Sequence, residues 1–170
     1  MGRVRGDHPG LLPIRDHISD LAAVDAPTRP LMSLGFAVFT VAIASAAAPL
    51  RRVIGTPGSI ALGVNAVVSG AIALAPLNVS PDGDRLHQVV AGAGYLALAV
   101  LAPVAAPALA KRRPMLAKAS VAVGATSLAF LALSLVAKEQ SGLWQRAGIT
   151  VTDVWLIAIG LLALRTDEPE

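Results

Sequence analysis

Three polar segments of the chain carry side chains that can bind a ligand or transfer protons. Aspartate and histidine side chains together can coordinate a divalent metal ion or act as a general acid and base. A guanidinium can hold a carboxylate or the phosphate of a lipid. The hydrophobic pattern described below brings the three segments to one face of a membrane, where they contribute Asp16, His17, Ser19, Asp20, Asp82, Asp84, His87, Gln145 and Arg146.

The spacing of these residues matches no established ligand pattern. Asp82-Gly-Asp84 lacks the remainder of a calcium-binding loop, and no HExxH sequence is present. The chain has no cysteine, which excludes a disulfide, a thiolate zinc site and a CxxCH haem attachment. We therefore predict no metal and no cofactor, and we leave catalytic roles unassigned. The candidate site at this face consists of Asp16, Ser19, Asp20, His87, Gln145 and Arg146.

The same residues also have a purely structural interpretation. Polar side chains at a membrane surface often cap helix ends and pair with each other beside water. In this chain the natural ion pair of that kind joins Asp20 to Arg146. A binding or catalytic site and a set of helix caps are therefore both open at this stage.

Two polar residues interrupt the apolar runs themselves. Asn65, with Ser69 about one turn later, is expected to hydrogen-bond between helices, an interaction of about 0.6 kcal/mol in membranes. Asp153 is an ionisable residue inside a span, which makes it a candidate for proton or ion relay. It lies about one turn beyond a polar loop, so contact with interfacial water or with Lys138 or Arg146 is the alternative.

Composition predicts that an α-helical membrane bundle positions these residues. Hydrophobic residues make up 55% of the 170 residues and charged residues 15%, against about 25% charge in soluble domains, and the mean hydropathy is +0.66. Apolar runs of about the 20 residues that cross a bilayer cover roughly 31–50, 58–77, 89–110, 119–137 and 149–164. We predict an all-α polytopic transmembrane bundle with about five spans.

The first 30 residues are polar and contain no span. Leu11, Ile14, Ile18 and Leu21 recur at intervals of three and four residues, which is one face of a helix. We predict a short amphipathic helix that docks on the bundle, with a frayed leader as the alternative. The predicted organisation is an extracytoplasmic leader over 1–30, the five-span bundle over 31–165 and a cytoplasmic tail over 166–170.

The placement of basic residues predicts the orientation. Each face receives seven, but one face gathers six of its seven in two short loops beside span ends, where positive charge favours the cytoplasm. These six are Arg51, Arg52, Lys111, Arg112, Arg113 and Lys118. We predict a multi-pass plasma-membrane protein with its N-terminus outside and its C-terminus in the cytoplasm. Nucleic acid is not an expected partner, because no basic face is interleaved with aromatic residues.

Several short elements make the chain resemble a known family. Ile14-Arg-Asp-His-Ile-Ser-Asp-Leu-Ala-Ala23, the loop with Asp82 and His87, and Gly142-Leu-Trp-Gln-Arg146 are similar to elements of the domain of unknown function 998 family. The resemblance implies a small polytopic membrane protein, mostly bacterial, and adds no catalytic assignment. Similar proteins usually have six spans, the first before the ISDL element. Residues 1–13 cannot cross a bilayer, so we expect that this helix is lost or that the chain begins at an internal Met.

The sequence is compatible with three functions. The first is a non-enzymatic helical bundle that binds membrane lipids or a partner membrane protein, and the absence of catalytic spacing favours it. The second is a membrane enzyme that acts on lipid headgroups through Asp20, His87 and Arg146. The third is a small transporter or channel that uses Asp153 and Asn65.

Overall fold

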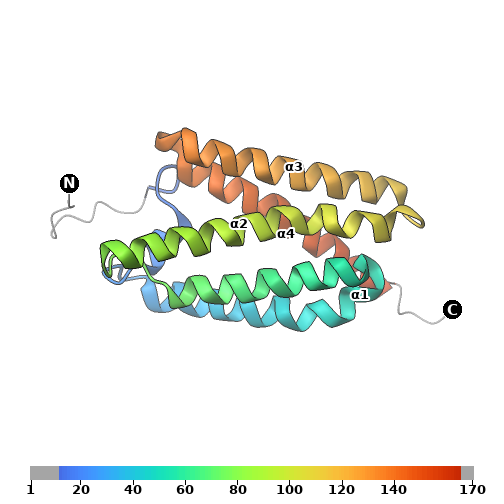
Figure 1. Ribbon diagram of the computed structural model, residues 1–170, viewed down its shortest axis with the longest axis horizontal. Helices are drawn as coiled ribbons and strands as arrows, with labels where there is room; N and C mark the ends of the chain where they lie inside the picture. Colours follow the sequence, from blue (N-terminus) through green and yellow to red (C-terminus); the bar gives the residue numbers. More distant parts are fainter. Residues whose placement is uncertain (1–11, 166–170) are drawn as a thin grey trace.

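The computed structural model describes residues 12–165, and all of the regular secondary structure in this range is helical (Figure 1). No strand occurs within this range, which confirms the predicted all-α class. The elements in chain order are the 3₁₀-helix η1 (Ile18–Ala22), α1 (Arg29–Leu74), α2 (Pro81–Ala110), α3 (Pro114–Val136), the 3₁₀-helix η2 (Lys138–Gln140) and α4 (Ser141–Arg165).

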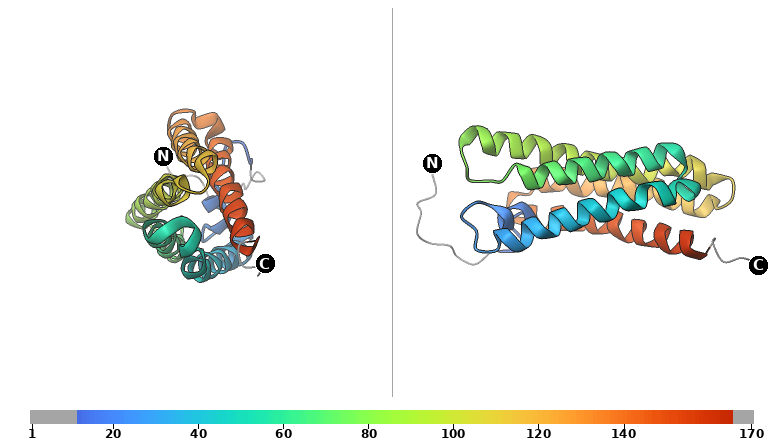
Figure 2. Two further views of the ribbon diagram at one scale, coloured as in Figure 1. Left: turned by 90° about the vertical axis from the view of Figure 1, so that its right-hand side faces the viewer. Right: turned by 90° about the horizontal axis from the view of Figure 1, so that it is seen from below.

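Helix α1 reverses direction at Gly55 and consists of two legs, which we call the first leg (29–54) and the second leg (56–74). Gly55 has φ 73° and ψ 174°, a conformation that residues with a Cβ rarely adopt. The hydroxyl of Ser59 donates to the carbonyl oxygen of Ala47 at 2.7 Å, across the reversal. Figures 1 and 2 show the legs side by side and antiparallel. The predicted runs 31–50 and 58–77 are therefore the two legs of one element.

The helices have the length and surface of membrane-spanning helices. Four of them, counting α1 once, are long and apolar enough to cross a membrane. Large apolar side chains are exposed along all four, for example Val41 at 64%, Val67 at 72% and Leu135 at 63%. Such surfaces are expected where a helix faces lipid tails rather than water. The chain is thus a multi-pass membrane protein, as its composition predicts.

Helices α2 and α4 begin about eight residues earlier than predicted, and α3 begins at Pro114 rather than near Ala119. Helix α2 starts at Pro81 rather than near Val89, so most of the predicted polar loop forms its first turns. Proline is favoured at a first helical position, the Ser80 hydroxyl accepts a hydrogen bond from the Gly83 N–H at 3.0 Å, and acidic residues are favoured in a first turn. Helix α4 likewise starts at Ser141 rather than near Ile149. Hydropathy detects the apolar part of a helix and misses its polar ends.

The predicted amphipathic helix over 11–21 is not formed as such. Leu11 lies outside the described residues, and a turn occupies the segment from Pro13 to Arg15. His17 is extended, with ψ 159°, and only Ile18–Ala22 is helical, as a 3₁₀-helix. Short turns within the segment use some of its backbone groups, and the carbonyls of Ile14 and Arg15 accept hydrogen bonds from α4, as described below.

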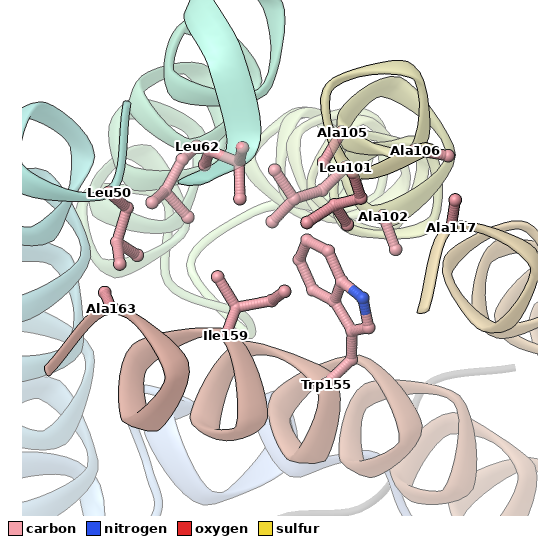
Figure 3. Packing of buried hydrophobic residues seen from close by; sticks show 12 residues of the cluster. Leu50, Leu62, Leu101, Ala102, Ala105, Ala106, Ala117, Trp155, Ile159 and Ala163 are labelled. Atoms are coloured by element: carbon pink, nitrogen blue, oxygen red, sulfur yellow. The ribbon is translucent and has the colours of Figure 1, made fainter. Parts of the chain in front are cut away.

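The two ends of the bundle differ in their interiors. We call them the leader end, where residues 12–28 lie, and the corner end, where α1 reverses and residues 110–114 join α2 to α3 (Figure 1). Toward the corner end the interior is apolar, and Figure 3 shows Leu50, Leu62, Leu101, Trp155 and Ile159 packed together there from α1, α2 and α4. The indole N–H of Trp155 donates to the Ser120 hydroxyl on α3 at 2.8 Å. Buried polar side chains such as His87 and Gln145 lie nearer the leader end.

Candidate functional site

The backbone of the leader caps the N-terminus of α4. The first N–H groups of a helix have no partner within it. Here the Gly142 N–H donates to the Arg15 carbonyl at 3.2 Å and the Leu143 N–H donates to the Ile14 carbonyl at 2.9 Å. The Ser141 hydroxyl also donates to the Arg15 carbonyl, at 2.8 Å. The leader thus takes the place of a capping side chain.

Arg146 fastens the same part of the leader from the next turn of α4. Its Nη1 atom donates to the carbonyl oxygens of Pro13 at 2.5 Å and of Asp16 at 2.8 Å. Gly142 makes this approach possible, because a Cβ there would lie 2.7 Å from the Arg146 Nη1 and 2.8 Å from the Pro13 carbonyl oxygen. The guanidinium therefore binds backbone carbonyls, where the sequence suggested a carboxylate or a lipid phosphate.

Gln145 connects the leader to the interior. Its Oε1 atom accepts the Ile18 N–H at 2.8 Å, and its amide nitrogen donates to the Tyr95 hydroxyl on α2. The side chain is only 5% exposed. Beside it lies a cavity of about 10 Å³, lined by Tyr95, Leu98, Ser127, Leu131, Gln145, Gly148 and Ile149, which is room for about one water molecule. Sequence reasoning missed Tyr95; the available signal was the chain's only tyrosine lying within an apolar run.

The carboxylates of the leader stabilise its own turns. An Asp16 carboxylate oxygen accepts the Leu12 N–H at 2.8 Å, and an Asp20 carboxylate oxygen accepts the His17 N–H at 2.8 Å. The anticipated ion pair between Asp20 and Arg146 is replaced by these local bonds. Ser19, between the two acids, is buried. The structure thus brings together five of the six candidate residues. The side chains of Asp16 and Asp20 bond within the leader, and those of Gln145 and Arg146 hold it on α4.

His87 occupies a different position in the bundle. It lies within α2, is 4% exposed, and its Nδ1 atom is 2.5 Å from the carbonyl oxygen of Ala75, where α1 ends. A carbonyl only accepts, so Nδ1 carries the proton in this contact. The Nε2 atom is buried and has no partner among the described residues. The hydrogen bond of His87 thus joins α2 to the end of α1, rather than to the leader or α4.

The loop before α2 has its own network. Asn78, at φ 65°, donates its backbone N–H to a carboxylate oxygen of Asp84 at 2.7 Å and its side-chain amide to Asp25 at 2.8 Å. Asp82 is exposed and lies 3.5 Å from Arg85. Between residues 12 and 165, no three His, Asp or Glu side chains are grouped so that they could hold a metal ion.

The two intramembrane candidates both retain unpaired oxygen atoms. Asn65 is 2% exposed, and its Oδ1 atom has no hydrogen-bond partner within the described part of the chain. The same is true of one carboxylate oxygen of Asp153 and of the hydroxyl of its neighbour Thr152. Thr152 is fully buried, whereas Asp153 is partly exposed. Unpaired buried oxygens of this kind are usually satisfied by water or an ion.

Comparison with known proteins gives one match. A family model described as "Protein of unknown function (DUF998)" matches residues 7–162, which is most of the chain. No curated protein and no solved structure matches it.

Proposed function

The chain belongs to the DUF998 family, and from the way its polar residues are used we propose that it is a non-enzymatic membrane bundle that binds membrane lipids or a partner membrane protein. The observation that carries this proposal is the hydrogen bonding of Arg146, Gln145 and Ser141 to the leader. Of the three groups assigned to a lipid-headgroup enzyme, Arg146 holds the leader on α4, Asp20 bonds within the leader and His87 bonds to the end of α1. Their geometry supports a structural role for the cluster.

The proposed membrane arrangement has five crossings. The two antiparallel legs of α1 support separate crossings, since legs of 26 and 19 residues correspond to about 39 and 28 Å of helix. Helices α2, α3 and α4 provide the other three, so the bundle covers residues 31–165. We place the leader end outside and the corner end in the cytoplasm of a plasma membrane, because the clustered basic residues lie at the corner end.

Cysteine labelling tests this orientation, because the chain has no cysteine of its own. Asp82 at the leader end and Lys111 at the corner end are both exposed. In intact cells, Asp82→Cys should react with a membrane-impermeant maleimide, and Lys111→Cys should react only after the membrane is permeabilised. The opposite labelling pattern would reverse the proposed topology.

Native mass spectrometry of the purified full chain tests the binding function. Mild release from detergent should leave phospholipid, or a second membrane protein, attached at stoichiometric levels. The enzyme alternative instead requires a bound divalent metal or turnover of a lipid headgroup, and either result would contradict the proposal. A chain that is stripped of every lipid and protein, and remains folded, would contradict it as well.

A transporter is the second candidate, because of the unpaired oxygen atoms of Asn65, Thr152 and Asp153. Ionisable residues inside a membrane bundle are often part of an ion or proton pathway. In proteoliposomes of the purified chain, ion flux that Asp153→Asn abolishes would favour this function over the binding bundle.

A further inference from the structure

Charge is distributed very unequally between the two ends of the bundle. Among residues 12–165, the leader end has five basic and six acidic side chains, whereas the corner end has seven basic and no acidic ones. The seven are Arg51, Arg52, Lys111, Arg112, Arg113, Lys118 and Arg165. All seven are exposed. Asp167, Glu168 and Glu170 follow in the sequence, outside the described residues.

The corner between α2 and α3 presents three of these cations in succession. Lys111 and Arg112 form the turn, and Arg113 has φ −145° and ψ 66°, outside the helical region. A residue before proline is kept out of the helical conformation by the proline ring, and Pro114 follows Arg113. Figures 1 and 2 show that this corner extends further along the bundle than the reversal of α1 and the end of α4. The three cations are therefore among the groups that project furthest at this end.

Exposed apolar side chains lie directly beside the cations. Met115, two residues after Arg113, is 75% exposed, and Leu164, beside Arg165, is 69% exposed. Lys118 lies one turn further along α3. A phospholipid offers both matching parts, an anionic phosphate and apolar tails. A nucleic acid would instead favour aromatic residues for stacking, and residues 110–118 contain none.

We propose that the corner end is a binding site for the phosphate headgroups of anionic phospholipids, with Lys111, Arg112 and Arg113 as its principal contacts. The inference rests on the proposed lipid-binding function and names the lipid class and the residues. Each basic residue near an anionic membrane surface strengthens binding about fivefold. Three neighbouring cations therefore favour an anionic lipid over a zwitterionic one with the same tails by well over tenfold.

The experiment compares two charge variants of the full chain in detergent micelles. Phosphatidylglycerol or phosphatidylcholine with identical tails is added, and bound lipid is counted by native mass spectrometry. The test variant is Lys111→Gln/Arg112→Gln/Arg113→Gln. The matched control removes three exposed cations from the leader end, Arg29→Gln/Arg85→Gln/Lys138→Gln. The unmodified chain and the control should prefer phosphatidylglycerol at least about tenfold, and the test variant should lose most of that preference.

The remaining outcomes separate this proposal from its alternatives. Arg112→Lys/Arg113→Lys keeps the charge and should keep the preference, so a loss of preference in that variant would contradict the charge-based site. Equal losses in the two triple variants would overturn the location. If inorganic phosphate alone binds at the corner and displaces the lipid, the site is one for free phosphate and the lipid assignment is wrong. If no lipid of either class binds, the lipid-binding form of the proposed function fails together with this site.

Discussion

Replacing Trp155 with alanine should destabilise the bundle by about 3–5 kcal/mol, the cost of removing a large buried aromatic side chain. Trp155 is 4% exposed and packs in the apolar core of Figure 3. The substitution also removes the N–H that Ser120 accepts at 2.8 Å. For a chain of this size the melting temperature should fall by roughly 6–20 degrees. Far-UV circular dichroism in detergent measures it without relying on tryptophan fluorescence.

Leu161→Ala is the matched control on the same helix. Leu161 is 55% exposed and faces the surroundings of the bundle, so its truncation leaves no internal cavity and should shift the melting temperature much less. Trp155→Phe should fall between the two, because it retains most of the volume and loses the hydrogen bond. If Trp155→Ala and Leu161→Ala had equal effects, the core at the corner end would not be the main source of stability.

Replacing Gly142 with alanine should release the leader from α4. The new Cβ would collide with the carbonyl oxygens of Pro13 and Asp16 and with the Arg146 guanidinium. Helical backbone at this position cannot move without breaking the bonds that Gly142 and Leu143 donate to the leader. Each lost hydrogen bond removes about 0.5–1.5 kcal/mol. Trypsin cleavage after Arg15 should accelerate at least tenfold, because cleavage follows the population of the open segment.

Gly160→Ala provides the control for this substitution. It lies on the same helix, and a Cβ there would meet nothing within 4 Å, so cleavage after Arg15 should be unchanged. Hydrogen exchange of the Ile18 N–H, which bonds to Gln145, should accelerate in Gly142→Ala and not in the control. Unaltered cleavage and exchange in Gly142→Ala would show that the leader is held by other contacts. Lipid preference at the corner end should survive the release of the leader, because the two sites lie at opposite ends of the bundle.

Much of the candidate site could be anticipated, but its chemistry could not. The segments with Asp16, Gln145 and Arg146 were expected at one end of the bundle, and they do meet there. Their hydrogen-bond partners, however, are mostly backbone groups of the leader, and every residue has such groups. No pattern of side-chain types could distinguish a guanidinium that binds carbonyls from one that binds a carboxylate. Tyr95 was missed although it is the chain's only tyrosine and lies within an apolar run, and no pattern indicated that His87 bonds to the end of α1.

The sequence by itself determined the all-α membrane class, the approximate positions of the apolar runs and the polar character of their ends. These properties follow from the transfer of side chains out of water, which depends mainly on local composition. Only the tertiary structure decided that the leader caps α4 and that Gly142 leaves room for Arg146 beside the leader. Those features depend on contacts between residues more than 100 positions apart, such as Ser141 with Arg15. Their energies exist only once the helices have packed.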